Sequence, residues 1–349
     1  MDSAIPSSHI GHPLQLAGIR HYQYQSGKAK GVEVYDIRTG GGLQYAVLKD
    51  RCLDIAWASF KGVNISYLCS PEVVAPTYYD SRDDGFLESF AGGLLATCGL
   101  ASAGAPSRDG DESLGLHGRI GNVPAEEAGF ESVRDGGKPG WRIHGRMREA
   151  KFFGVHLTLE REIRSAWGEN RIRIHDRVRN LGHQAQPFQL LYHINFGYPL
   201  LDQDSELVLP ARAVQPRNAR ATEGLEQHLR IEPPQAGYEE QCFYHDLKTD
   251  QEGYAYAALL NARLGFGVYE KFRKDTLPRF VQWKQMGQGA YVLGLEPGNC
   301  LPDGRSVERE RGNLVLLDPG QEAEMEVEIG ILDGAEAIDQ FRALLGRCR

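Results

Sequence analysis

Residues 171–180 read RIRIHDRVRN, a stretch in which charged and apolar residues nearly alternate. A period of two is typical of a β-strand that buries one face and exposes the other. Similar short stretches recur along the chain between turns rich in Gly, Asn, Asp and Pro, at 32–38, 43–48, 141–150, 155–164, 188–197, 254–260, 265–272 and 323–332. The pattern predicts an all-β protein, built as one large antiparallel β-sandwich.

Helical patterns are scarce. The stretch 333–347, DGAEAIDQFRALLGR, predicts a short C-terminal helix with an apolar side, and 85–95 predicts a helical turn. The polar stretches 108–115 and 230–241 are expected to be loops, and no linker or low-complexity tract divides the chain. We therefore expect one sandwich domain over residues 1–349. The apolar side of the predicted helix consists of Ile338, Phe341, Leu344 and Leu345.

Composition restricts the possible partners. The chain has 349 residues, of which 41% are hydrophobic and 25% charged, and its net charge is 39 − 47 = −8. This acidic balance argues against nucleic acid and anionic membranes as partners. Residues 1–15 are polar and show no signal-peptide pattern, and we find no long apolar run. The sequence thus indicates a cytoplasmic protein, either a monomer or a homodimer.

The six cysteines form no C-x-x-C pair and are irregularly spaced. This spacing disfavours both a disulfide framework and a cysteine zinc site. Reduced thiols in the core are the simpler interpretation.

Polar residues interrupt the predicted strand at 190–201, LLYHINFGYPLL. One face of this strand is apolar, whereas the other pairs His193 with Asn195 and ends at Gly197. Such a face is costly to bury unless its polar groups have partners. A histidine held by a hydrogen bond in the core is the simple interpretation, and a functional site is the alternative. The apolar face consists of Tyr192, Ile194 and Phe196.

A second histidine, His117, lies between glycines in SLGLHGRIGNVPAEE (113–127), with Arg119 two residues later. The glycines leave space for a close approach to the backbone. A solvated loop histidine is the alternative interpretation.

The stretch 280–300 predicts a hairpin around MGQGA. Gln282 and Lys284 share a face of its first strand, and Gly294 and Glu296 share a face of its second. The glycine two residues before Glu296 leaves room above the sheet. An exposed strand lysine is the alternative interpretation of Lys284.

Two histidines and a glutamate beside glycines suit general acid–base catalysis. The sequence has no G-x-S-x-G nucleophile motif, and the glycine run at 39–44 lacks the context of a phosphate-binding loop. Zinc bound by His117, His193 and Glu296 remains an alternative, because two His and one carboxylate form a known ligand set.

Several motifs of the chain resemble those of the galactose mutarotase (aldose 1-epimerase) superfamily. Its early His-Gly motif is similar to LHGRI, its mid-chain histidine strand to YHINFG and its late segment to LEPGNCLPD. DRCLDI (50–55), FAGGLLATCGL (90–100) and QWKQMGQGAYVLGLEPGNC (282–300) resemble a divergent branch that includes deoxyribose mutarotase. The resemblance spans about residues 30–332.

The resemblance implies a β-supersandwich that interconverts the α and β anomers of an aldose without a cofactor or a metal. It implies that Glu296 is the general base, His193 the general acid and His117 a residue that helps to hold the ring oxygen. One base and one acid on opposite sides of the sugar ring are expected to open the hemiacetal.

Further residues are candidates for binding the sugar, namely Arg51, Lys284, Asn195, Gln282 and Arg119. Two other functions stay open: a non-catalytic carbohydrate-binding protein on the same fold, and another sugar isomerase, lyase or hydrolase. Hydrolysis is disfavoured because glycosidases usually need two carboxylates, and the sequence offers one strong candidate.

Overall fold

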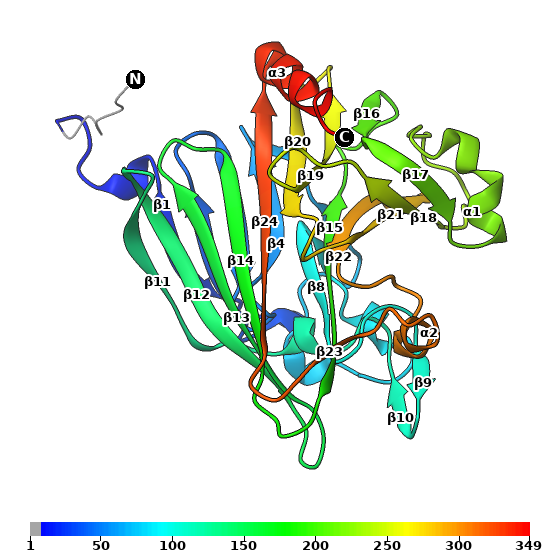
Figure 1. Ribbon diagram of the computed structural model, residues 1–349. Helices are drawn as coiled ribbons and strands as arrows, with labels where there is room; N and C mark the ends of the chain where they lie inside the picture. The colour runs from blue at the N-terminus through cyan, green and yellow to red at the C-terminus, as the bar shows by residue number, and fades with distance from the viewer. Residues whose placement is uncertain (1–7) are drawn as a thin grey trace.

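The computed structural model describes residues 8–349, which form two large sheets of antiparallel strands and a few short helices (Figure 1). Residues 1–7, part of the stretch in which we expected no signal, lie outside the described residues. Apolar side chains from both sheets meet in one large core cluster between them. The prediction of an all-β antiparallel sandwich is confirmed.

One sheet has 12 strands and carries the candidate site. Its order along the hydrogen-bonded path is β1 (Gly18–Gln23), β2 (Glu33–Arg38), β3 (Leu43–Leu48), β4 (Asp54–Phe60), β8 (Leu95–Leu100), β15 (Gln186–Phe196), β22 (Tyr291–Gly298), β21 (Arg279–Met286), β18 (Gln241–Leu247) and β17 (Ala211–Pro216). Two short strands extend it: β5 (Val63–Asn64) pairs with β4, and β23 (Val315–Leu317) pairs with β15.

The other large sheet has eight strands. Its order is β11 (Glu126–Asp135), β12 (Lys138–Ala150), β13 (His156–Ala166), β14 (Arg171–Asn180), β24 (Glu322–Asp333), β20 (Phe266–Arg273), β19 (Tyr254–Asn261) and β16 (Ser205–Val208). Two small two-stranded sheets complete the β-structure. They pair β6 (Tyr67–Leu68) with β7 (Gly92–Gly93), and β9 (Ser107–Asp109) with β10 (Glu112–Leu114).

The α-helices are α1 (Ala219–Glu223), α2 (Arg305–Glu310) and α3 (Ala335–Leu345). The predicted C-terminal helix is α3, which buries Phe341 and Leu345 against the aromatic rings of Tyr256 and Tyr269. The 3₁₀ turns are η1 (Pro13–Gln15), η2 (Gly27–Ala29), η3 (Pro76–Tyr78), η4 (Gly85–Glu88), η5 (Ile120–Asn122) and η6 (Leu225–Gln227). Within residues 8–349, no helix combines the length and the apolar character that crossing a membrane requires.

Most of the predicted strands are found at or near their expected positions. The stretch 171–180 is β14, and 280–300 forms the hairpin of β21 and β22. The prediction for 108–115 was wrong, because this polar stretch forms most of the β9–β10 hairpin. The helical turn expected at 85–95 is shorter, ending with η4 before β7 begins.

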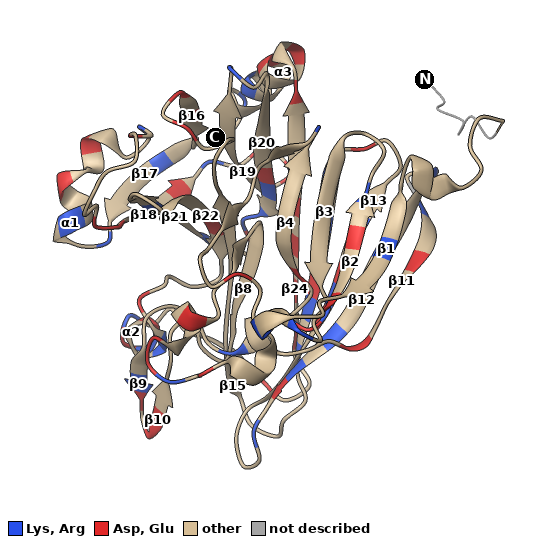
Figure 2. Cartoon of the chain, turned by 180° about the vertical axis from the view of Figure 1, so that it is seen from behind, with Lys and Arg blue, Asp and Glu red and all other residues tan. Residues whose placement is uncertain are grey.

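The alternation in β14 has a direct structural cause. Ile172, Ile174 and Val178 point into the core between the sheets, where each is at most 1% exposed. The arginines of the same strand point outward and pair with neighbouring strands, as Arg177 does with Glu324 of β24 at 3.0 Å. On this outer face, arginines of β12 and β14 pair with glutamates of β13 and β24. Figure 2 shows the molecule from the opposite side, where β3 and β8 of the 12-stranded sheet carry no charged residue. Such exposed pairs keep the face hydrophilic but stabilise the fold little.

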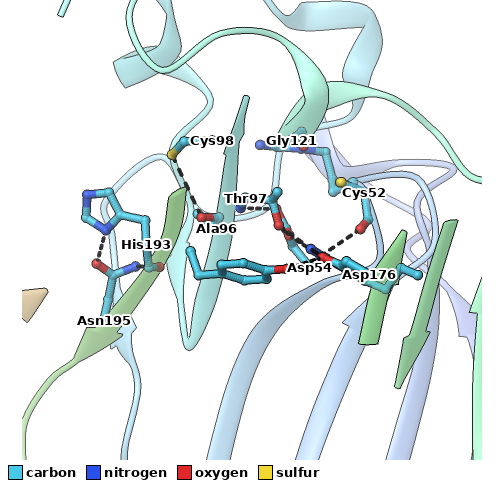
Figure 3. Close-up of polar contacts among 12 residues, drawn as sticks. Cys52, Asp54, Ala96, Thr97, Cys98, Gly121, Asp176, His193 and Asn195 are labelled. Carbon is cyan, nitrogen blue, oxygen red and sulfur yellow. Dashed lines mark hydrogen bonds and ion pairs between the residues drawn. The ribbon is translucent and has the colours of Figure 1, made fainter. Parts of the chain in front are cut away.

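One inward position of β14 is charged, and it belongs to a buried ionic network (Figure 3). Asp176 accepts two hydrogen bonds from the guanidinium of Arg161 on β13, at 2.9 and 2.7 Å. Across the core, Arg161 also donates to Asp54 of β4 and to Thr97 of β8, at 3.1 and 2.8 Å. Tyr192 of β15 donates to Asp176 at 2.7 Å. The network therefore connects strands of both sheets.

In contrast to the carboxyls of the network, the buried carboxyl of Glu270 has no hydrogen-bond partner. Glu270 on β20 is 0% exposed, and neither of its oxygens makes a hydrogen bond. Burial raises the pKa of Glu270 well above its usual range, and the charge of Glu296 adds to this effect. The folded protein therefore favours the protonated form of Glu270.

We predict that Arg161→Met lowers the free energy of unfolding by about 3–5 kcal/mol, because it leaves Asp176 and Asp54 as buried carboxylates without their cation. Chemical denaturation measures this loss. The matched control is Arg164→Met on the outer face of the same strand, which should change stability by at most about 0.5 kcal/mol. Equal losses in the two variants would contradict a special role for the buried network.

We predict that Glu270→Gln stabilises the protein increasingly as pH rises. Because the pKa of Glu270 is raised in the fold, unfolding releases its proton above the unfolded pKa of about 4.3. Between that value and the folded pKa, the wild type loses about 1.4 kcal/mol per pH unit that the variant keeps. Denaturation curves from pH 4 to pH 8 should show that the difference in unfolding free energy between the variant and the wild type increases with pH. Glu336→Gln, on the exposed side of α3, is the control, and a constant gap would contradict the prediction.

Candidate functional site

A cavity of about 290 Å³ lies on the side of the 12-stranded sheet that faces away from the core. It brings together His117, His193 and Glu296, which are far apart in the sequence. Its other lining residues are Phe86, Leu87, Phe90, Ala105, Pro106, Leu116, Arg217, Glu240, Cys242, Val281, Trp283 and Pro302. A concave site with aromatic walls and a few convergent polar groups is typical of a small-molecule site.

Strand register places the histidine and the glutamate side by side. β15 and β22 pair with Leu191 opposite Gly298 and Ile194 opposite Leu295, so that His193 lies opposite Glu296. The imidazole Nε2 is 3.3 Å from the carboxyl Oε1. This arrangement differs from the expected one, in which a base and an acid flank the sugar from opposite sides.

The glycine two residues before Glu296 is required by this geometry. A Cβ added to Gly294 would lie 2.5 Å from Glu296 Oε1 and 3.1 Å from the Cβ of Trp283. The space above Gly294 is therefore occupied by the carboxyl of Glu296 itself, which folds back over the strand.

Burial controls the charges of the central pair. It lowers the pKa of His193 to about 4, against the opposing effect of the hydrogen bond to Asn195. It raises the pKa of the Glu296 carboxyl well above its usual range, an effect that Glu240 increases and Arg217 opposes. The cavity therefore favours a neutral imidazole and a protonated carboxyl.

The turn that carries His117 is tightly constrained. His117 has a φ of 58°, which is unusual for a residue with a side chain, and its ring centroid is 5.5 Å from that of His193. Burial lowers the pKa of His117 well below its usual range, and His193 and Arg217 add to this effect. The adjacent Gly118 gives room not to a ligand but to the backbone, since a Cβ there would meet Ser102 O at 2.0 Å.

Two polar atoms at the cavity lack partners. Glu296 Oε1 and His117 Nδ1 are buried and make no hydrogen bond, and the contact between Glu296 and His193 lacks hydrogen-bond geometry. Buried polar atoms are normally paired. Both residues line the cavity, so a polar ligand bound there would be one source of the missing hydrogen-bond partners.

Arg217 is a cavity residue that the sequence did not indicate. It follows β17, and its guanidinium donates to Asp303 at 3.1 Å and to the carbonyl oxygen of Pro302 at 3.1 Å. Asp303 also accepts a hydrogen bond from Tyr244 at 2.6 Å. Asp303 is the aspartate of the LEPGNCLPD motif. The motif therefore supplies Glu296 to the cavity and also the ion-pair partner of Arg217, the cationic residue of the cavity.

Glu240 and Trp283 form another unpredicted pair in the cavity wall. The indole Nε1 of Trp283 donates to Glu240 at 2.6 Å, and its ring lies 5.2 Å from that of His193. The sequence did not indicate Trp283 because it lies between Gln282 and Lys284, the polar residues of β21 that were the candidates for sugar binding. Val281, Trp283 and Glu296 point to the cavity, whereas Gln282 and Lys284 point to the other side of the sheet.

The five predicted sugar-binding residues do not line the cavity. Lys284 is 1% exposed and pairs with Glu232 at 2.7 Å, and Gln282 is hydrogen-bonded to His245 at 3.0 Å. Arg119 is exposed at the start of η5.

Arg51 and Asn195 are buried behind the cavity wall. Arg51 donates to three backbone carbonyl oxygens, those of Gly121, Val74 and Ser89. Because Ser89 adjoins the cavity residue Phe90, Arg51 supports this wall from behind. Asn195 lies beneath His193, with its amide bonded to the protein at both ends.

The alternative of a metal site can be tested against this geometry. Within residues 8–349, no group of three or more His, Cys, Asp or Glu side chains is arranged to hold a metal ion. His117, His193 and Glu296 thus line one cavity without forming a ligand set.

Comparison with protein families identifies the chain. Residues 29–331 match the family described as "Domain of unknown function (DUF4432)". The chain belongs to the DUF4432 family. No curated protein matches the sequence of this DUF4432 chain.

Solved structures relate this DUF4432 fold to sugar epimerases. A Klebsiella pneumoniae protein described as a "putative aldose 1-epimerase" has 25% sequence identity and a TM-score of 0.88, over 95% of this chain and 88% of that chain. A galactose mutarotase-like protein from Clostridium acetobutylicum has 13% identity and a TM-score of 0.67, over 91% and 99%. Galactose 1-epimerase from Lactobacillus acidophilus has 14% identity and a TM-score of 0.61, over 91% and 100%. The last two likenesses concern the fold alone.

A larger groove of this DUF4432 protein, about 530 Å³, lies on the outer face of the eight-stranded sheet. Its walls are the charged side chains of β13, β14 and β24 that pair across the strands. The smaller cavity is the better candidate site, because it brings two histidines and a glutamate together between aromatic walls, whereas the groove is lined mainly by charged side chains that pair with one another.

We predict that Gly294→Ala in this DUF4432 protein displaces the Glu296 carboxyl while leaving the fold intact. The closest contact of the added methyl group is with the far end of the flexible Glu296 side chain, and the contacts with Trp283 at 3.1 and 3.2 Å need only a small shift, so the cost in stability should be small. A crystal structure of the variant should show Nε2 and Oε1 more than 3.3 Å apart. A misplacement of this kind can reduce a reaction rate about a hundredfold.

The control is Gly346→Ala after α3, where the nearest contacts of the new methyl group are at 3.7 Å. An unchanged carboxyl position in Gly294→Ala would contradict the prediction.

Proposed function

We propose that this protein is an aldose 1-epimerase-like enzyme, which interconverts the α and β anomers of a sugar by general acid–base catalysis. The observation that carries the proposal is the contact between His193 Nε2 and Glu296 Oε1, 3.3 Å apart in an aromatic-walled cavity. The structural likeness to the Klebsiella pneumoniae protein described as a "putative aldose 1-epimerase" supports it.

The adjacent positions of the two groups suit the reaction. The anomeric hydroxyl oxygen and the ring oxygen are bonded to the same carbon, C1, so neighbouring protein groups can reach both. Once the proton that the pair shares has passed from Glu296 to Nε2 of His193, the carboxylate of Glu296 takes the anomeric proton while His193 gives its proton to the ring oxygen. The bond between C1 and the ring oxygen breaks, and an open-chain aldehyde forms. Rotation about the C1–C2 bond and the reverse steps then close the ring as the other anomer.

The remaining cavity residues would bind the sugar. His117 offers an unpaired Nδ1, in keeping with a role at the ring oxygen. Trp283, Phe86 and Phe90 provide flat apolar walls, and Arg217 and Glu240 provide polar groups. The proposal needs no cofactor or metal. Within the superfamily, the sequence motifs favour the branch that includes deoxyribose mutarotase, so deoxypentoses belong among the first sugars to test.

Glycoside hydrolysis is a second candidate, because Glu240 adds a second carboxylate to the cavity of Glu296. A non-catalytic sugar-binding protein is a third possibility on this fold. Release of reducing ends from oligosaccharides would identify a hydrolase, and saturable binding without exchange would identify a binding protein.

We predict that the protein accelerates anomer exchange of at least one aldose, measured by NMR exchange spectroscopy in a buffer that does not catalyse mutarotation. The panel includes pentoses, deoxypentoses, 6-deoxyhexoses and hexoses. Glu296→Gln keeps the size of the side chain but removes the base, so turnover should fall about a hundredfold to ten-thousandfold. His193→Asn should cause a loss of the same order.

The matched control is Lys284→Met, one strand away but on the other side of the sheet, whose effect should be on stability. A folded Glu296→Gln protein that exchanges anomers at the native rate would sink the proposal.

A further inference from the structure

Asn195 lies directly beneath His193 on β15, and the surrounding carbonyl groups determine the orientation of its amide. Nδ2 is 2.9 Å from the carbonyl oxygen of His193 and 3.4 Å from that of Gly92. Carbonyl oxygens only accept hydrogen bonds, so the NH₂ group must face them. The amide oxygen Oδ1 therefore faces the imidazole, 2.6 Å from Nδ1 (Figure 3).

This orientation determines where His193 carries its hydrogen. An acceptor 2.6 Å from Nδ1 requires an N–H group at Nδ1. A neutral imidazole has only one N–H, so its Nε2 keeps a lone pair, and Nε2 is the nitrogen that faces Glu296.

We propose that Asn195 is a positioning residue, which holds neutral His193 as the Nδ1–H tautomer and makes Nε2 the one nitrogen that exchanges protons in the cavity. The tautomer itself follows from the contacts of Asn195. Its consequence for turnover rests on the proposed function.

The proton balance shows why this tautomer matters. The pair of Glu296 and His193 shares one proton. With that proton on Nε2, His193 is an imidazolium and Glu296 a carboxylate, and ring opening moves one proton to the ring oxygen and takes one from the anomeric hydroxyl. The pair then consists of a protonated Glu296 and a neutral His193.

Ring closure requires Nε2 of that neutral imidazole to accept the proton back from the ring hydroxyl, while Glu296 returns its proton to the aldehyde oxygen. A neutral imidazole with its hydrogen on Nε2 could not accept it. Asn195 excludes that idle tautomer, and its oxygen can accept from Nδ1–H in both charge states.

A structural role for Asn195 must be separated from this one, since its amide also ties β15 to Gly92 of β7. The test therefore uses ¹⁵N NMR of the imidazole nitrogens in histidine-labelled full-length protein, which reports the tautomer without any substrate. The chain has 11 histidines, and the signals lost in His193→Asn assign His193.

We expect neutral wild-type His193 to show N–H at Nδ1 and a free Nε2. Asn195→Leu removes the acceptor, so the Nε2–H tautomer should gain population. Loss of a partner that orients a functional histidine typically costs about tenfold to a hundredfold, here in kcat with little change in KM. Asn195→Asp keeps an acceptor at Nδ1, so it should retain the tautomer, shift the titration of His193 to higher pH and restore part of the turnover.

The pH profile must be interpreted with the other groups that face His193 across the cavity. They are Glu296 on β22, His117 in its turn, Arg217 after β17, Glu240 before β18 and Cys242 on β18. The structural control is Asn180→Leu, another buried asparagine, whose partners are all backbone groups. It should reduce stability without changing the His193 signals.

A wild-type His193 that carries its hydrogen on Nε2 would overturn the proposal, and so would an unchanged tautomer in Asn195→Leu. If Asn195→Leu does not fold, the tautomer seen in the wild-type spectrum and in the spectrum of Asn195→Asp still tests the proposal. An Nδ1–H tautomer in a protein that exchanges no sugar would refute the proposed function but not the tautomer lock.

Discussion

The guanidinium of Arg161 is the point at which the two sheets are held in one arrangement. Apolar contacts between the sheets are numerous but not directional, and they would tolerate small shifts of one sheet over the other. Hydrogen bonds from one planar cation to Asp176 on its own sheet, and to Asp54 and Thr97 on the other, allow little such movement. Burial increases the cost of any shift that breaks one of these bonds, since an unpaired member of the network would be a charge in a medium of low dielectric constant.

The candidate site is built on the strands that this network holds. Tyr192 points into the core and bonds Asp176, whereas the next residue, His193, points into the cavity. Thr97 bonds Asp54 from β8, the strand that pairs with β15 beside His193. Because successive residues of a strand face opposite sides, each strand anchored on the core side presents its neighbouring side chain to the cavity in a defined position.

Burial has opposite consequences on the two sides of the 12-stranded sheet. In the core, cations and carboxylates have partners, with Glu270 as an exception. At the cavity, the same low dielectric constant favours a neutral imidazole and a protonated carboxyl side by side, with unpaired atoms left over. A proton can pass within such a pair without changing the net charge of the cavity, which suits a reaction that both takes and returns protons.

Periodicity and turn chemistry determined much about this protein by sequence alone. Alternation in RIRIHDRVRN predicted β14, and the same pattern predicted most of the sandwich and the hairpin that carries Glu296. These predictions depend only on local sequence, because a strand with one buried face needs an alternation of apolar and polar residues wherever it lies in the fold. The helix α3 was predictable for the same reason, from its apolar side.

Tertiary structure alone decided which polar residues meet. Arg51, Lys284 and Gln282 have polar side chains of the kind that bind ligands, but they point away from the cavity. Arg217, Glu240 and Trp283 line it instead. The pairing of β15 with β22 and of β18 with β21 joins segments that are about a hundred and about forty residues apart in the chain. No local pattern encodes which face of a strand turns inward when both carry polar residues, because that choice depends on what the opposite sheet and the distant loops bring to each face.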